Sequence, residues 1–166
     1  TLLVAILVWM GLPVILQGLG LHPECPPFEG DLSGRSALVI STSHSEMCGE
    51  SGGKTGVAAS ELLHPYYEFL DAGMDVDVAS IQGGDIPIEP GMLDWPIAGE
   101  YEGRFQADPV ALEAVGHSLK IDDVDFTQYD VVFLAGGWGA AFDLGQSKVL
   151  GDKITEANAS GALLGA

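Results

Sequence analysis

Short apolar runs alternate with amphipathic stretches along most of this chain. Mainly apolar or β-branched runs predict strands at 36–42, 129–135 and 162–166, and alternation of polar and apolar residues predicts another at 75–80. Between these runs, apolar residues on one face predict helices over 57–72, 108–117 and 146–159. Gly73 is placed to end the first helix, and Asp108-Pro109 supplies a cap and a first-turn proline for the second.

Strands that alternate with helices predict an α/β fold, a doubly wound, flavodoxin-like parallel sheet with helices on both faces. Ligands bind such sheets at the carboxyl ends of the strands, so we expect a site in the loops that follow Thr42, Ser80, Ala135 and Ala166. Residues 43–56 are predicted to be a long loop and 81–107 a long excursion. The second is long enough to suggest a functional excursion or an insertion.

The first residues differ from the rest, because no charged side chain occurs before Glu24. Residues 1–21 are about as long as the ~20-residue helix that crosses a bilayer, and we expect a hydrophobic transmembrane anchor there. A cleaved signal peptide and a buried helix are the alternatives. Residues 22–35 are predicted to be a linker, and 36–166 a domain on the extracytoplasmic side, secreted or periplasmic if the segment is cleaved.

Charge and cysteine content narrow the possible partners. The chain has 24 acidic and 6 basic side chains in 166 residues, a formal net charge of −18. That balance argues against nucleic acid, whose affinity for proteins comes from Lys and Arg. The two cysteines, Cys25 and Cys48, form no Cys-x-x-Cys pair; a disulfide between them stays open.

Candidate chemistry gathers after the predicted strands. Gly136-Gly137-Trp138 follows a strand directly, where glycines let backbone N–H groups approach an oxyanion; a tight turn is the plainer alternative. His44 lies at the same end of the sheet. Glu61 and His64 share a helix face, but no third metal ligand is apparent, so we expect no metal and no cofactor.

Taken together, these stretches resemble the ThiJ/PfpI superfamily, which has the class I glutamine amidotransferase-like fold. The resemblance covers most of 36–166 and is strongest toward the large branch of heat-shock glyoxalases and deglycase-like proteins. The stretches that carry it are 37–42, Thr55-Gly56 leading to Glu61 and Pro65, 69–80 with Gly83-Gly84, 129–144 and 161–166.

The resemblance implies roles for individual residues. Glu61 matches the acidic residue that contacts the family's nucleophilic cysteine and, in glyoxalases, is expected to shuttle protons. Gly136 and Gly137 match the loop that lines the oxyanion pocket. Trp138 stands where the heat-shock branch often has His. A metal site of that branch has its helix ligand near Leu70, so it is not carried over to this chain.

The family's nucleophilic cysteine has no counterpart here, since neither Cys25 nor Cys48 follows a strand at the family's elbow. The run Gly161–Ala166 matches the strand that precedes that elbow, so we expect a fragment truncated at both ends. A pseudoenzyme half is the alternative.

The resemblance therefore implies a cysteine-dependent enzyme acting on a small-molecule carbonyl substrate, such as methylglyoxal converted to lactate. The alternatives are an amidase or peptidase-like hydrolase and a non-catalytic, membrane-tethered stress or holdase protein. For partners, we expect membrane contact only through residues 1–21, with a homodimer as a further option.

Overall fold

The computed structural model describes part of the chain: residue 19 and residues 30–49, 52–95 and 97–166. It divides into two units, Thr1–Gly30 and Asp31–Ala166. Except for residue 19, the predicted transmembrane segment 1–21 lies outside the described residues, as does Cys25. No helix of the described ranges combines the length and the apolar character that crossing a membrane requires.

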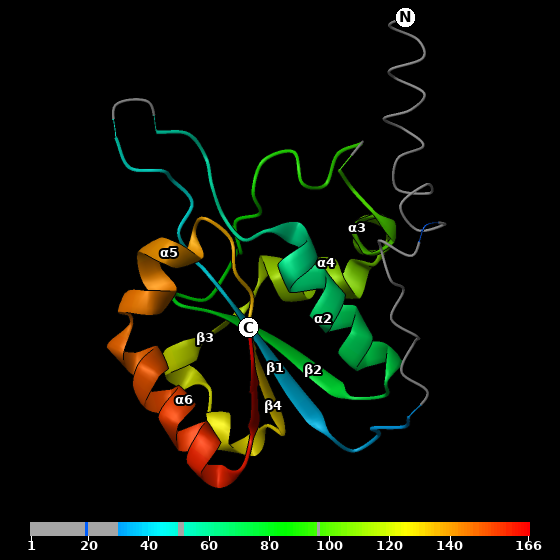
Figure 1. Ribbon diagram of the computed structural model, residues 1–166, viewed down its shortest axis with the longest axis vertical. Helices are drawn as coiled ribbons and strands as arrows, with labels where there is room; N and C mark the ends of the chain where they lie inside the picture. The colour runs from blue at the N-terminus through cyan, green and yellow to red at the C-terminus, as the bar shows by residue number, and fades with distance from the viewer. Residues whose placement is uncertain (1–18, 20–29, 50–51, 96) are drawn as a thin grey trace, which may run out of the picture. The chain divides into compact units, whose positions relative to one another are not determined.

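A five-stranded parallel sheet forms the centre of the second unit (Figure 1). Its order is β3-β2-β1-β4-β5, so the chain starts in the middle and winds outward in both directions. The strands are β1 (Ser36–Ser41), β2 (Asp75–Ser80), β3 (Leu119–Lys120), β4 (Val131–Leu134) and β5 (Leu163–Gly165). The doubly wound fold and the four predicted strands are confirmed. The two residues of β3, both exposed, are too few for a sequence pattern.

The helices of the described part are α2 (Ala59–Asp71), α3 (Glu100–Ala107), α4 (Pro109–Gly116), α5 (Ala140–Asp143) and α6 (Lys148–Ser160). Two 3-10 turns, Ile121–Asp123 and Phe126–Gln128, join β3 to β4, and a third, Leu144–Gln146, follows α5. The three predicted helices are confirmed as α2, α4 and α6. At α4, the Asp108 side chain accepts hydrogen bonds from the first-turn amides, as its cap position predicts.

The excursion 81–107 contains α3, a helix that the sequence pattern did not predict. Only Glu102 and Phe105 of this helix are buried, and it contains Gly103, a residue that disfavours helices. Such a sequence has no apolar stripe, so tertiary packing rather than its own pattern makes it helical.

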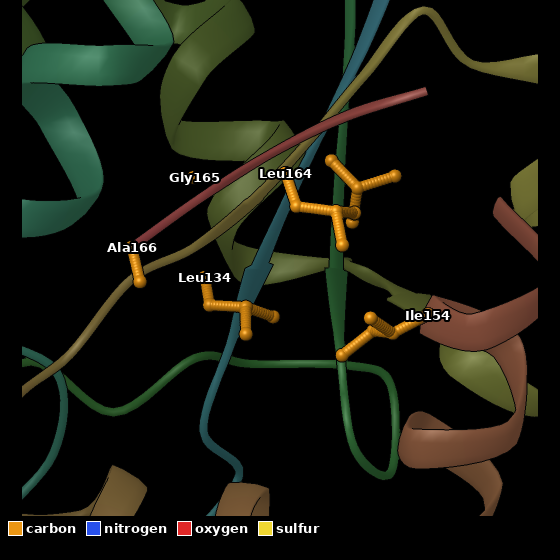
Figure 2. Close-up of a pocket in the computed structure, with 6 residues that line it drawn as sticks. Leu134, Ile154, Leu164, Gly165 and Ala166 are labelled. Carbon is orange, nitrogen blue, oxygen red and sulfur yellow. The ribbon is translucent and has the colours of Figure 1, made fainter. Parts of the chain in front are cut away.

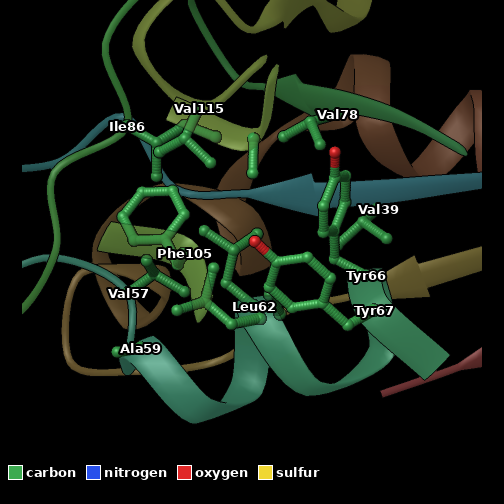
Figure 3. Packing of buried hydrophobic residues seen from close by; sticks show 13 residues of the cluster. Val39, Val57, Ala59, Leu62, Tyr66, Tyr67, Val78, Ile86, Phe105 and Val115 are labelled. Atoms are coloured by element: carbon green, nitrogen blue, oxygen red, sulfur yellow. The ribbon is translucent and has the colours of Figure 1, made fainter. Parts of the chain in front are cut away.

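Hydrophobic residues fill both faces of the sheet. On one face, Val39 packs with α2, α3 and α4 side chains such as Leu62 and Phe105 (Figure 3). On the other, Leu38 and Ile40 pack with residues that include Leu150 of α6. Residues 37–40 are fully buried, which explains why β1 reads as a continuous apolar run.

The residues just before β1 belong to the second unit. Leu32 N–H donates to the Ala72 carbonyl at 2.8 Å, and Arg35 Nη1 lies 2.6 Å from Asp130 Oδ1. These contacts fix the start of β1 against its neighbours at the amino end of the sheet.

Candidate active site

At the carboxyl end of the sheet, the turn after β4 packs against the segment that leads into α2. Ala58 N–H donates to the Gly136 carbonyl at 3.1 Å, and Gly139 N–H donates to the Gly56 carbonyl at 2.9 Å. These hydrogen bonds join the Gly136–Gly139 turn to the first turn of the helix that carries Glu61.

The positions of Gly136 and Gly137 leave no room for a side chain. A Cβ atom added at Gly136 would lie 2.3 Å from Glu61 Oε2, and one at Gly137 would lie 2.5 Å from Ala58 N. Gly137 also has a φ of +134°, which side chains disfavour. In the described part of the chain, the Gly136 and Gly137 N–H groups donate to no acceptor, so both remain available to a ligand.

Glu61 lies in the first turn of α2 with its side chain exposed. Pro65 stands four residues later inside the helix, so the Glu61 carbonyl lacks its usual intrahelical donor. The Glu61 carboxylate forms no hydrogen bond or ion pair with any described residue. It borders a depression of about 320 Å³, lined by Ala58, Glu61, Glu89, Met92, Gly137 and Trp138. The structure therefore brings the predicted residues Glu61, Gly136, Gly137 and Trp138 together.

His44 lines a different depression, of about 280 Å³, with Ser43, Ser45, Glu46, Gln82 and Asp143. Its ring stacks on Phe142 with centroids 4.4 Å apart, and its Nε2 bonds the Glu46 carbonyl. His44 thus lines a different depression from the other predicted site residues, and its role stays a prediction.

Two carboxylates organise this end of the sheet without having been predicted. Asp143 accepts hydrogen bonds from Thr42 Oγ1 and from Ser43 N–H, both at 2.8 Å, and so fixes the loop after β1. Glu89 lines the 320 Å³ depression, as Glu61 does. The sequence did not predict the hydrogen bonds of either carboxylate, because their partners are distant in the chain.

The His64 side chain is directed to Glu102 rather than to Glu61. Its Nε2 lies 3.8 Å from Glu102 Oε1, and its ring meets Tyr101 edge-on at 4.8 Å. Within the ranges that the structure describes, no three or more His, Cys, Asp or Glu side chains are grouped to hold a metal ion.

The larger depression is negatively charged. Its ionisable lining residues are Glu61 and Glu89, and no Lys or Arg lines it. Trp138 contributes an indole that is 66% exposed. Together these side chains offer hydrogen-bond acceptors, one candidate base and an apolar surface to a small uncharged ligand.

A third depression, of about 210 Å³, lies between β5 and α6 and has an apolar wall (Figure 2). It is lined by Val132, Leu134, Ile154, Leu164, Gly165 and Ala166. None of these side chains can exchange a proton or attack a carbon, so we place the candidate chemistry at the Glu61 depression instead.

The amino-acid sequence is similar to those of known glyoxalases. A probable glutathione-independent glyoxalase of Saccharomyces cerevisiae is 29% identical over 133 residues, which cover 80% of this chain and 56% of the relative. No family model matches the chain.

The chain is also similar to solved structures. The Rapid Encystment Protein 24 kDa of Francisella tularensis superposes with a TM-score of 0.72 and 34% identity, covering 80% of this chain and 57% of its own. Glyoxalase III of Candida albicans superposes with a TM-score of 0.68 and 25% identity, covering 78% and 55%.

The chain spans about half the length of these relatives. Its homologues are glutathione-independent glyoxalases. The chain belongs to the ThiJ/PfpI superfamily.

Proposed function

We propose that the complete protein is a glutathione-independent glyoxalase that converts methylglyoxal to lactate. The observation that carries the proposal is the Glu61 carboxylate, held against the Gly136 Cα at the carboxyl end of β4 without a described partner. A carboxylate in that place is free to move a proton of a bound substrate. The relatives named as glyoxalases support the substrate class.

The proposed nucleophile is a cysteine in the part of the protein that follows β5. Strand β5 pairs with β4 in parallel, with Phe133 opposite Gly165. In that register Ala166 lies opposite Leu134, and the two positions after it would lie opposite Ala135 and Gly136. A thiol there would lie near both the Glu61 carboxylate and the glycine turn.

The proposed reaction has three steps. The thiol adds to the aldehyde carbon of methylglyoxal, forming a C–S bond and a hemithioacetal. Glu61 takes the proton from that carbon to give an enediol and returns it to the neighbouring carbon, while the hydroxyl proton passes from the first oxygen to the second, which leaves a lactoyl thioester. Water cleaves the thioester, releasing lactate and restoring the thiol. Unpartnered amides at Gly136 and Gly137 are suited to bind the oxygen that becomes negative.

Product analysis on the complete protein tests this function against the hydrolase of the same fold. Methylglyoxal should yield stoichiometric lactate, with no ammonia released from glutamine and no cleavage of peptides. Ammonia or peptide products without lactate would replace the glyoxalase with an amidase or peptidase. Suppression of client aggregation without turnover of any of these substrates would favour a holdase.

We also propose that the protein acts outside the cytoplasm, on the evidence of the uncharged residues 1–21 alone. Fractionation of cells that express the complete protein tests this placement: it should be recovered with membranes or in the extracytoplasmic fraction. Recovery in the cytoplasmic fraction would contradict it.

A further inference from the structure

Glu89 connects the excursion after β2 with the segment that leads into α2. Its N–H donates to the Val57 carbonyl at 2.9 Å, and Val57 N–H donates to the Pro87 carbonyl at 2.8 Å. Val57 and Ile88 thus form an isolated parallel bridge outside the main sheet. The backbone at Glu89 is thereby fixed beside the start of α2.

The side chain of Glu89 reaches back to the same segment. Its Oε2 accepts from Thr55 Oγ1 at 2.7 Å and from Gly56 N–H at 3.0 Å. Thr55 is 1% exposed, so its hydroxyl depends on this carboxylate for a partner. One oxygen atom therefore holds two successive residues in place.

The restrained residues continue directly into the candidate site. The Gly56 carbonyl accepts from Gly139 N–H, and Ala58 N–H donates to the Gly136 carbonyl. Gly56 is packed closely against the backbone of Pro87, since a Cβ at Gly56 would lie 2.0 Å from the Pro87 carbonyl oxygen. Movement of the Thr55–Gly56 segment would therefore move both the glycine turn and the first turn of α2.

We propose that Glu89 is a positioning residue, which acts through Thr55 and Gly56 to keep Glu61 and the Gly136–Gly139 turn in register. The proposal rests on the proposed glyoxalase function for its kinetic consequences. Its structural consequence, restraint of the Gly56 and Gly139 amides, does not depend on that function.

The substitution Glu89→Gln distinguishes a positioning role of Glu89 from a role in proton transfer. The amide oxygen of Glu89→Gln still accepts from Thr55 and Gly56, whereas the side chain of Glu89→Ala cannot. A positioning role therefore predicts that Ala is impaired and that Gln recovers most of the lost function. A proton-transfer role predicts that both variants are equally impaired.

The experiment measures kcat and KM for methylglyoxal across pH in the complete protein, with amide hydrogen exchange of Gly56 and Gly139 by NMR. Glu89→Ala should lower kcat by about tenfold or more, with an unchanged pH profile and faster exchange at both amides. Glu89→Gln should restore kcat and slow exchange. The control Glu156→Ala, on the exposed surface of α6, should match wild type in both readouts.

Either a wild-type kcat in Glu89→Ala or equal loss in both variants would overturn the proposal. If Glu89→Ala does not fold, Thr55→Val removes one of the two donors and should shift kcat and exchange in the same direction by less; no shift would overturn it. If the wild-type protein makes no lactate, the proposed function fails, and amide hydrogen exchange alone tests the positioning role of Glu89. Faster exchange in Ala but not in Gln then supports positioning, and unchanged exchange contradicts it.

Discussion

The carboxylate of Glu61 occupies the space where a side chain at Gly136 would begin, with Oε2 2.3 Å from the Cβ position. This contact joins the first turn of α2 to the turn after β4. It explains why a glycine is needed at 136 although its φ is not in the left-handed region, and it places the candidate base beside the glycine turn.

Replacing Gly136 with alanine should displace Glu61 and lower kcat of the complete protein for methylglyoxal by about tenfold or more. Gly145→Ala is a matched control, because a Cβ there meets nothing within 4 Å. Steady-state kinetics on samples shown to be folded by circular dichroism make the comparison. Equal kcat in the two variants would mean that the contact has no catalytic consequence.

Gly56→Ala should destabilise the protein, because the new Cβ would lie 2.0 Å from the Pro87 carbonyl oxygen and 2.4 Å from its carbon. Backbone atoms cannot rotate away, so we expect a loss of about 1–3 kcal/mol or more in the free energy of unfolding. Gly53→Ala, in open space in the same loop, is the control. Urea denaturation measures both, and equal midpoints would contradict the close packing.

Two fully buried serines, Ser41 and Ser80, differ in whether their hydroxyl forms a hydrogen bond. Ser80 Oγ bonds Ser43 Oγ at 3.0 Å and Ser118 Oγ at 2.8 Å, whereas the equally buried Ser41 Oγ has no partner among the described residues. Ser80→Ala should cost about 1 kcal/mol of unfolding free energy.

Ser41→Ala should be neutral or stabilising, because it removes a buried hydroxyl that forms no hydrogen bond. Thermal or chemical unfolding of both variants decides the point. A larger loss in Ser41→Ala than in Ser80→Ala would show that the hydroxyl network is not as described.

Acid should weaken the amino end of the sheet through Asp130. The Ser36 N–H and then the Arg35 guanidinium lower the pKa of this carboxyl below its usual value. The stabilising contribution is therefore present above the unfolded-state pKa of about 3.9 and is lost as pH falls through the lower folded-state pKa.

The variant Asp130→Asn should accordingly be less stable than wild type at pH 7, with the difference shrinking as the solution is acidified toward pH 2. Unfolding free energies from urea titrations at several pH values test the sign. A difference that is constant or grows on acidification would contradict the assignment.

The sheet was predictable because β1, β2 and β4 carry their own patterns; the residues 37–40, for instance, are fully buried and all apolar. Helix α3 was not, since its position depends on contacts of Phe105 and Glu102 with distant residues. Local pattern predicts an element only where burial follows the element's own period.

The site was predictable in part for a similar reason. Glu61 and the glycine turn were found through family resemblance and position after a strand, and the structure brings them together. Glu89 had no such signal, because its partners Thr55 and Gly56 lie more than thirty residues away and are met only through the path of the excursion. His44 shares the correct end of the sheet but lines another depression.

The most direct test of the central claim is kcat of the complete protein for lactate formation in Glu61→Gln, compared with wild type and with Glu156→Gln on α6. If Glu61 transfers the proton, the first variant should lose at least about 100-fold in kcat, while the α6 variant stays at the wild-type value. A Glu61→Gln variant that keeps the wild-type kcat would contradict the role of Glu61 and the mechanism built on it.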